Sequence, residues 1–259
     1  MRFAINRVKF LKHIKVYVTI ITVFAATILI KSPLWFKQKL PEDNFISLAM
    51  LRTLITYCIT EECEGDIILE DRGMSTASGL AFKTVNDATY ILTANHFCNP
   101  GDHGIDTGVF GTIDSNIFVS DSQGDLWSSK IVYSNSEYDL CLVESEMPEV
   151  STIMLAETTP EVGEKVYTIS APEGFALREV GLHFEGFFSG CDYEELCYYT
   201  IPSTFGSSGS IILNRNSKIV GMIQMSPRTF DFTSIGVGVD TIRMFLNEAS
   251  AHLGQNIAN

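Results

Sequence analysis

The sequence predicts an all-β protein that ends in a helix, and three observations support this fold class. From about residue 67 to residue 240, short apolar runs recur between turns that contain Gly, Asn and Asp, a pattern typical of strands. Helical periodicity is convincing in only two stretches after residue 40. With 259 residues and 46% hydrophobic content, the chain can bury one substantial core, or two small ones packed together.

The first element along the chain is an apolar run at residues 16–30 (VYVTIITVFAATILI), with five Lys or Arg residues before it and three soon after it. The run is longer than many signal-peptide cores and shorter than a full membrane span, but Lys31 can extend it by snorkelling while Trp35 lies at the interface. No cleavage site of small residues follows. We therefore expect residues 1–40 to be an uncleaved single-pass anchor, with a cytoplasmic N-terminus and the rest of the chain on the exported, periplasmic or extracellular side. Secretion after signal cleavage is the alternative.

Residues 41–66 are predicted to form a helical linker. Within them, residues 44–57 (NFISLAMLRTLITY) carry apolar side chains at spacings that suit a short amphipathic helix. The folded domain is then expected over residues 67–259.

Eleven strand signals follow in that domain, separated by turns such as residues 85–88 and 214–217. In order, they are SGLAF, TYILTANHF, NIFVS, KIVYS, DLCLVES, KVYTIS, VGLHFEGFF, CYYTI, SIILN, KIVGMIQM and SIGVGV. The final pattern predicts a helix with Asp240 as its N-cap and Gly254 as its stop signal. Its apolar face consists of Ile242, Phe245, Leu246, Ala249 and Leu253.

The charge of the chain excludes one class of partner. The first forty residues carry eight basic and no acidic side chains, which leaves ten basic against 31 acidic residues in the remainder. Such an acidic surface repels phosphate backbones, so we expect no nucleic-acid partner. We also expect no metal ion and no cofactor, because no Cys-x-x-Cys or His/Cys cluster has the spacing of a zinc site.

The six cysteines are compatible with an exported domain. Cys191 and Cys197 bracket a short polar loop and are the pair we expect to form a disulfide. Cys58 could pair with Cys63 or with Cys98. Cys141 lies in an apolar strand, where a free buried thiol is the default expectation.

Three short sequences carry potential chemistry, in a fixed order. Residues 92–98 (LTANHFC) deliver His96 to the end of a strand, residues 138–143 (YDLCLV) place Asp139 at the start of one, and residues 206–210 (GSSGS) place Ser208 in a glycine-rich turn. A serine hydroxyl is a poor nucleophile at neutral pH, so it needs a histidine to accept its proton and a carboxylate to orient the imidazole. Glycines next to Ser208 let the main chain turn so that the N–H groups of Gly206 and Ser208 can face an oxyanion.

At these positions the chain resembles the chymotrypsin-like serine proteases, and among them the HtrA/Deg-type protease domain. The family blocks T-A-x-H, D-x-A-L-[IV] and G-x-S-G-[GS] match residues 93–96, 139–143 and 206–210 in the same order, and G-x-x-V-x-x-I-G-x-P is similar to residues 163–172. The resemblance implies two packed six-stranded antiparallel β-barrels. It also implies a serine endopeptidase that cleaves polypeptides through an acyl-enzyme intermediate, with His96, Asp139 and Ser208 as its triad.

The resemblance also implies where substrate specificity lies. The family places the base of its specificity pocket about six residues before the nucleophile, here at Pro202, and builds the walls from the segment that matches Gln224, Met225 and Ser226. Without a carboxylate at the base, we expect cleavage after small or medium aliphatic residues. Cleavage after Glu is the rival, with His183 as the candidate pocket histidine.

Several positions depart from the family pattern. Ser210 stands where many members have Gly, and Ile211 where they have Pro. Cys98 is two residues past the histidine rather than one, and the SGLAF strand has no cysteine to pair with it, so the usual disulfide beside the active site is not expected. We expect no PDZ domain after the final helix.

Two other interpretations compete with the triad. A hydrolase with the order Ser208, Asp231 or Asp240, and His252 needs Gly-x-Ser-x-Gly between a strand and a helix, but position 210 is serine and a strand follows. A catalytically inactive two-barrel domain that acts as a membrane-tethered scaffold is the alternative function. The presence of all three triad residues favours the enzyme.

Overall fold

The computed structural model describes residues 41–57, 67–99, 111–174, 181–227, 230 and 232–258. The expected anchor at residues 1–40 and residues 58–66 of the expected linker lie outside the described residues. Among the described residues, no helix is both long enough and apolar enough to cross a membrane.

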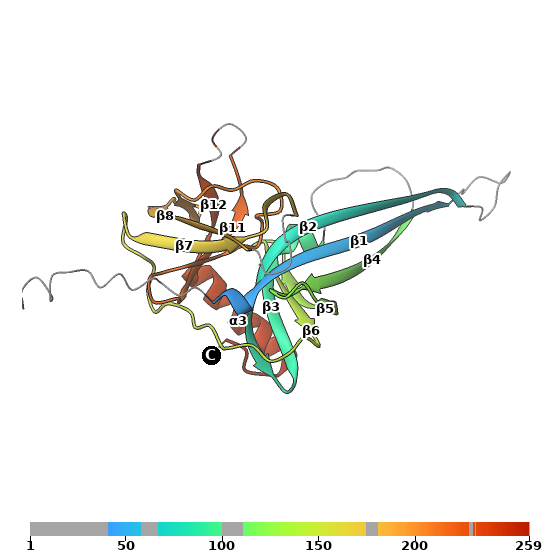
Figure 1. Ribbon diagram of the computed structural model, residues 1–259, viewed down its shortest axis with the longest axis horizontal. Helices are drawn as coiled ribbons and strands as arrows, with labels where there is room; N and C mark the ends of the chain where they lie inside the picture. Colours follow the sequence, from blue (N-terminus) through green and yellow to red (C-terminus); the bar gives the residue numbers. More distant parts are fainter. Residues whose placement is uncertain are drawn as a thin grey trace, which may run out of the picture. The chain divides into compact units, whose positions relative to one another are not determined.

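Twelve strands of the described part close into two six-stranded barrels, and every strand pair is antiparallel (Figure 1). The first barrel contains β1 (Phe45–Tyr57), β2 (Ile67–Val85), β3 (Ala88–Ala94), β4 (Gly111–Ser120), β5 (Leu126–Asn135) and β6 (Leu140–Ser145). The second contains β7 (Lys165–Ser170), β8 (Leu182–Cys191), β9 (Leu196–Tyr199), β10 (Ile211–Leu213), β11 (Ile219–Met225) and β12 (Ser234–Gly238). The predicted all-β, two-barrel architecture is confirmed.

The predicted helix at residues 44–57 is wrong, because this segment forms β1, which pairs with β2 and β4. A 3-10 turn, η1 (Glu42–Asn44), precedes it. The four residues from Phe45 to Leu48 are all buried, so this part of the strand lacks the alternation of buried and exposed residues that marks a half-buried strand. The first barrel therefore begins at Phe45, well before the boundary expected at residue 67.

Three apolar clusters explain why so many strands are buried on both faces. One fills the first barrel, around residues such as Ile91 and Val143, and another fills the second barrel, around Tyr199 and Ile212. The third joins residues of both barrels, such as Leu92 and Met222, to the C-terminal helix. Strands that face two of these clusters lose their polar face, as β3 and β11 do.

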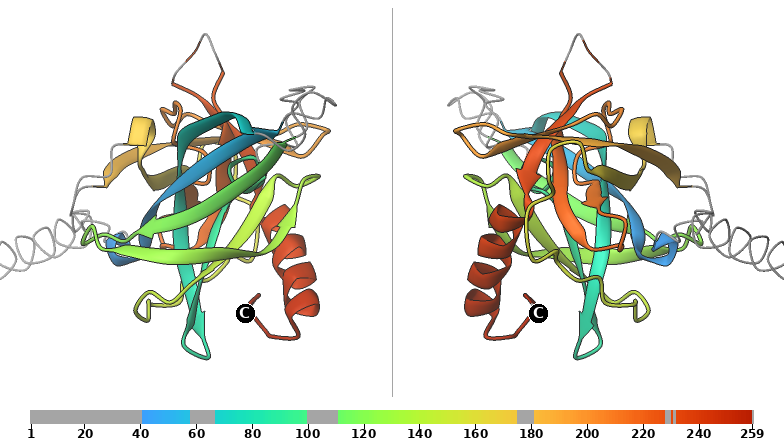
Figure 2. Two further views of the ribbon diagram at one scale, coloured as in Figure 1. Left: turned by 90° about the vertical axis from the view of Figure 1, so that its right-hand side faces the viewer. Right: turned by 90° about the vertical axis from the view of Figure 1, so that its left-hand side faces the viewer.

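The C-terminal helix, α3 (Val239–Leu253), covers the third cluster with Ile242, Phe245 and neighbouring apolar residues, as predicted. Figure 2 shows this helix beside the strands. Gly254 ends it in the left-handed conformation (φ 63°), which confirms the predicted stop. Asp240 is not the N-cap, because β12 runs directly into the helix and Gly238 takes that position. The carboxylate of Asp240 instead pairs with Arg243 and accepts a hydrogen bond from Thr159.

Candidate active site

His96 lies just past the end of β3, in a single helical turn, α2 (Asn95–Cys98). Its Nδ1 is 2.8 Å from Oδ2 of Asp139, and its main-chain N–H donates to Oδ1 of the same carboxylate at 2.8 Å. Asp139 thus holds both the imidazole and the backbone of His96. The sequence placed these two residues 43 positions apart, and the pairing of β3 with β6 brings them together.

Asp139 ends the turn between β5 and β6 and has a positive φ of 50°, which is uncommon for a residue other than Gly. Its carbonyl accepts hydrogen bonds from the N–H of Asn95 at 3.1 Å and from Nε2 of Gln224 at 3.2 Å. A positive φ costs a residue other than Gly about 1–3 kcal/mol. These two hydrogen bonds hold the backbone in that conformation.

Gln224 connects Ser208 to the turn that carries Asp139. The hydroxyl of Ser208 donates to the main-chain carbonyl of Gln224 at 3.2 Å, and Nε2 of Gln224 donates to the carbonyls of Tyr138 (2.6 Å) and Asp139. The side chain of Gln224 is buried and is directed at this turn. The residue expected as a pocket wall therefore spans the two barrels.

Only some of the main-chain N–H groups in the turn that contains Ser208 are hydrogen-bonded to described residues. Three of them donate to main-chain carbonyls: Ser207 to Thr204 (3.0 Å), Gly209 to Ile223 (2.8 Å) and Ser210 to Ser207 (3.0 Å). The N–H groups of Gly206 and Ser208 have no acceptor among the residues that the structure describes. These are the two groups that the sequence indicated for an oxyanion hole.

Glycine is required at two positions of this turn. Gly206 and Gly209 have φ values of 85° and 84°, in the left-handed region that favours glycine. A Cβ on Gly209 would lie 2.1 Å from the carbonyl oxygen of Ser78, and one on Gly206 would lie 2.7 Å from that of Ala171. The close packing of both barrels against the turn explains why glycines flank Ser208.

Ser78, in β2, is a residue of the site that the sequence did not single out. It is fully buried, and its N–H donates to the carbonyl of Ser208 at 2.9 Å, while its hydroxyl donates to the carbonyl of Gly206 at 2.8 Å. The only signal for it in the sequence was its place at the start of the SGLAF strand.

The region expected to form the specificity pocket is polar but carries no charge that the structure describes. Pro202 is half-buried, and Met225 is 47% exposed. The hydroxyl of Ser226 donates to that of Ser203 at 2.7 Å, and Ser203 donates to the carbonyl of Thr233 at 3.3 Å. Among the described residues, no ion pair or hydrogen bond joins a charged side chain to Pro202, Ser203, Met225 or Ser226.

His183, the candidate for recognition of Glu, lies in β8 and pairs with Ile169 across the strand register. Its Nε2 is 3.7 Å from a carboxylate oxygen of Glu42, in η1. An imidazole that already faces a carboxylate is a poor partner for a second one, so the contact disfavours the role.

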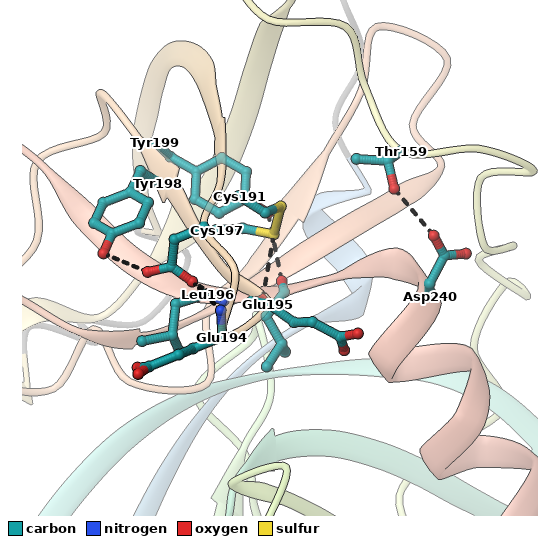
Figure 3. Close-up of a disulfide and its surroundings, with 11 residues drawn as sticks. Thr159, Cys191, Glu194, Glu195, Leu196, Cys197, Tyr198, Tyr199 and Asp240 are labelled. Atoms are coloured by element: carbon teal, nitrogen blue, oxygen red, sulfur yellow. Dashed lines mark hydrogen bonds between the residues drawn. A yellow bond between two sulfur atoms is a disulfide. The ribbon is translucent and has the colours of Figure 1, made fainter.

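The cysteines correct one expectation and confirm another. Cys98 and Cys141 form a disulfide, so Cys141 is not a free thiol and Cys98 does not pair with Cys58. Both are buried in the core of the first barrel, where sequence alone cannot separate a half-cystine from an apolar filler. The expected disulfide between Cys191 and Cys197 closes the β8–β9 hairpin (Figure 3). The possible partner Cys63 lies outside the described residues.

No group of three His, Cys, Asp or Glu residues in the described part of the chain could hold a metal ion.

Comparisons with known proteins identify the family and the fold. A family model described as a trypsin-like peptidase domain matches residues 77–222, which include His96, Asp139 and Ser208. Among solved structures, the chain is similar to a serine endoprotease from Yersinia pestis, with a TM-score of 0.57 and 16% sequence identity. The match covers 82% of this chain and 64% of the endoprotease chain, and at this identity it concerns the fold. A search of curated proteins gives no match. Because the family match extends over more than half of the 259 residues, the chain belongs to the trypsin-like peptidase domain family.

Proposed function

We propose that this protein is a serine endopeptidase that hydrolyses peptide bonds with His96, Asp139 and Ser208 as its catalytic triad. The observation that carries the proposal is that these three residues, from separate segments, lie in one hydrogen-bonded network. Asp139 holds His96, and Gln224 joins the turn of Asp139 to the hydroxyl of Ser208.

In the proposed reaction, Oγ of Ser208 first exchanges its acceptor, the Gln224 carbonyl, for Nε2 of His96. As Oγ attacks the peptide carbonyl carbon, its proton passes to His96, and the carbonyl oxygen becomes an oxyanion. The intermediate collapses to an acyl-enzyme when the C–N bond breaks and His96 gives the proton to the leaving amine. Water then repeats the sequence, and the new acid is released as Ser208 regains its proton.

The roles of the remaining groups follow from the charges that develop. Asp139 keeps the Nδ1 proton of His96 in place and stabilises the imidazolium that forms at each step. The N–H groups of Gly206 and Ser208 lack acceptors among the described residues, so they are available to the oxyanion. Donors that need no rearrangement during the reaction stabilise the transition state most effectively.

Hydrolysis of a mixed peptide library by the purified residues 41–259 tests this proposal. We expect cleavage by the wild type and a loss of about 10⁶-fold in kcat for Ser208→Ala, because the variant retains only the oxyanion hole and substrate binding. Ser207→Ala is the matched control, since it removes a neighbouring hydroxyl and leaves the nucleophile. Equal activity of the wild type and Ser208→Ala would support the inactive scaffold instead.

For specificity, we propose cleavage after small or medium aliphatic residues. Pro202, Met225 and Ser226 offer no charged partner, and burying an unpaired charge there costs several kcal/mol. The same library reports the residue before each cut. Dominant cleavage after Arg or Lys would refute the pocket assignment, and cleavage after Glu that disappears in His183→Ala would transfer recognition to that histidine.

For location, we propose that residues 1–40 anchor the protein in a membrane with the barrels on the exported side. The basic flank, the apolar run at residues 16–30 and the lack of a small-residue cleavage site support it. The full chain should remain with the membrane fraction after carbonate washing, and protease added from the exported side should digest the domain. A soluble product that begins near residue 30 would identify a cleaved signal.

A further inference from the structure

We propose that a buried chain of three serines, Ser210, Ser170 and Ser78, positions the oxyanion hole, a role that rests on the proposed endopeptidase activity. None of the three touches the substrate site directly. They act through the carbonyl groups of the turn that holds Ser208.

The three side chains connect the barrels beneath that turn. All three are at most 1% exposed. Oγ of Ser210 donates to Oγ of Ser170 at 2.8 Å, and Oγ of Ser170 is 3.5 Å from that of Ser78. Ser78 is in β2 of the first barrel, whereas Ser170 ends β7 of the second.

The direction of the hydroxyl protons along this chain is fixed by its two ends. The single proton of Ser78 goes to the carbonyl of Gly206, at 2.8 Å, and Ser78 also accepts from the N–H of Ala171 at 2.9 Å. The proton of Ser210 goes to Ser170. The proton of Ser170 is then directed at Ser78, because Ser78 has no second proton to offer. All three hydroxyls thus donate toward Gly206.

The consequence is that both peptide groups beside Gly206 are held in place. The carbonyl before it, that of Phe205, accepts from the N–H of Glu173 at 2.5 Å, and the carbonyl of Gly206 itself accepts from Ser78. Because C=O and N–H point in opposite directions across a trans peptide, the bond from Glu173 turns the N–H of Gly206 the other way. Glycine at φ 85° could otherwise rotate easily.

Ser78 also fixes the other end of the turn. Its main-chain N–H donates to the carbonyl of Ser208 at 2.9 Å. One residue of the first barrel therefore holds the peptide groups that follow Gly206 and Ser208. Each is adjacent to the peptide group whose N–H is a proposed oxyanion donor.

The family blocks given above have Gly at the position of Ser170, and Gly or Ser at the position of Ser210. A lone buried hydroxyl at either place would lose its hydrogen bonds to water without a replacement. In this chain the two hydroxyls are hydrogen-bonded to each other, and Ser170 extends the contact of Ser78 into the second barrel.

The test compares Ser78→Ala with Ser145→Ala. Ser145 is also a buried serine of the first barrel, and its hydroxyl donates to the carbonyl of Ser128 at 3.3 Å, away from the Ser208 turn. The readouts are kcat, KM, the thermal midpoint and the inhibition constant of a peptide aldehyde, which forms a hemiacetal whose oxygen occupies the oxyanion hole.

For Ser78→Ala we expect kcat to fall about 10-fold to 100-fold, which is less than the loss from removal of an oxyanion donor. Aldehyde affinity should weaken by the same factor, and KM should change less than about twofold, because only the transition state uses these donors. Ser210→Ala retains the bond from Ser78 to Gly206, so it should show a smaller loss of the same kind. It also provides the test if Ser78→Ala does not fold.

Unchanged kcat and aldehyde affinity in Ser78→Ala and Ser210→Ala would overturn this inference and leave the endopeptidase proposal intact. Parallel changes in KM and the thermal midpoint, no different from those of Ser145→Ala, would also overturn it. If the wild type neither cleaves peptides nor binds the aldehyde, the proposed function itself fails.

Discussion

The two halves of the candidate site are held together in different ways. In the first barrel, His96 and Asp139 contact each other directly, and a disulfide joins the residues two positions after each of them, Cys98 and Cys141. In the second barrel, no disulfide of the described residues lies beside the turn of Ser208, which is restrained by hydrogen bonds, two of them from Ser78 in the other barrel. The base and its carboxylate are therefore assembled within one barrel, whereas the nucleophile depends on the docking of both.

This difference predicts that substitutions in the two regions affect different parts of the candidate site. Changes within the first barrel should affect the His96–Asp139 pair directly, while changes at the interface should affect Ser208 and its oxyanion donors. Gln224 is the exception, because it contacts both halves at once.

Among the changes that distinguish the two halves, the largest effect is expected from Asp139→Asn, which breaks the pair in the first barrel. The amide cannot stabilise the imidazolium of His96, so kcat should fall about 10⁴-fold. Asp121→Asn is the matched control, because Asp121 also accepts main-chain hydrogen bonds in a turn of this barrel, from Gln123 and Asp125. Peptidase assays should show near-normal activity for the control. Activity retained by Asp139→Asn would remove Asp139 from the triad.

The next largest effect is expected when each of the two disulfides is removed in turn. Replacing Cys98 and Cys141 by Ala removes a link across 43 positions, and replacing Cys191 and Cys197 removes one across six. Loop-closure entropy predicts losses of about 4 and about 2 kcal/mol in the free energy of unfolding. Denaturant unfolding measures both, and peptide hydrolysis should decrease only in the first variant. Equal effects on stability and activity would show that the Cys98–Cys141 bond has no special relation to the site.

Gln224→Leu tests the one residue that links both halves. It leaves the carbonyls of Tyr138 and Asp139 without their side-chain donor, which costs about 1–3 kcal/mol when such groups are buried. Because small displacements of catalytic groups are costly, we expect kcat to fall about tenfold. Gln255→Leu, which removes the acceptor of the Tyr90 hydroxyl, should leave kcat unchanged. An unaffected Gln224→Leu enzyme would mean that the halves hold their geometry independently.

The smallest expected effect concerns the anchoring of the Asp139 turn to α3 at alkaline pH. The hydroxyl of Tyr138 donates to Glu248 at 3.1 Å, and this bond, together with desolvation, raises the pKa of Tyr138. A raised folded-state pKa stabilises the protein below the unfolded value of about 10 and loses that contribution as pH rises further. The thermal midpoint of the wild type should therefore drop more steeply above about pH 10 than that of Tyr138→Phe. Tyr193→Phe, at a 93% exposed position, should follow the wild type.

Most of the fold could be predicted from the sequence because the strands of the second barrel are short and most strands are bounded by clear turns. Asn86 and Asp87 both adopt positive φ in the β2–β3 hairpin, as their residue types favour. β1 could not be recognised, since both of its faces are covered at Phe45–Leu48 and its periodicity disappears. The predicted helix start is too late along the chain. Val239, the first residue of the helix, is buried in the core of the second barrel and therefore looks like part of the preceding strand.

The three short sequences that carry the candidate site could be predicted, but the contacts around them could not. His96, Asp139 and Ser208 lie in short patterns whose chemistry can be recognised. Ser78 and the disulfide of Cys141 depend on which strands become neighbours, which a single sequence does not encode locally. The contact of the Gln224 amide with the Asp139 turn could not be predicted for the same reason.

The assignment of Ser208 as the nucleophile is tested most directly by identifying the residue that reacts with a serine-directed fluorophosphonate. The purified residues 41–259 are incubated with the probe, digested and analysed by mass spectrometry, alongside Ser208→Ala and His96→Ala. We expect a single adduct on Ser208 in the wild type, none in Ser208→Ala, and strongly slowed labelling in His96→Ala, because the hydroxyl then lacks its base. An adduct on another serine, or no adduct on a folded wild-type protein, would contradict the assignment of Ser208 as the nucleophile.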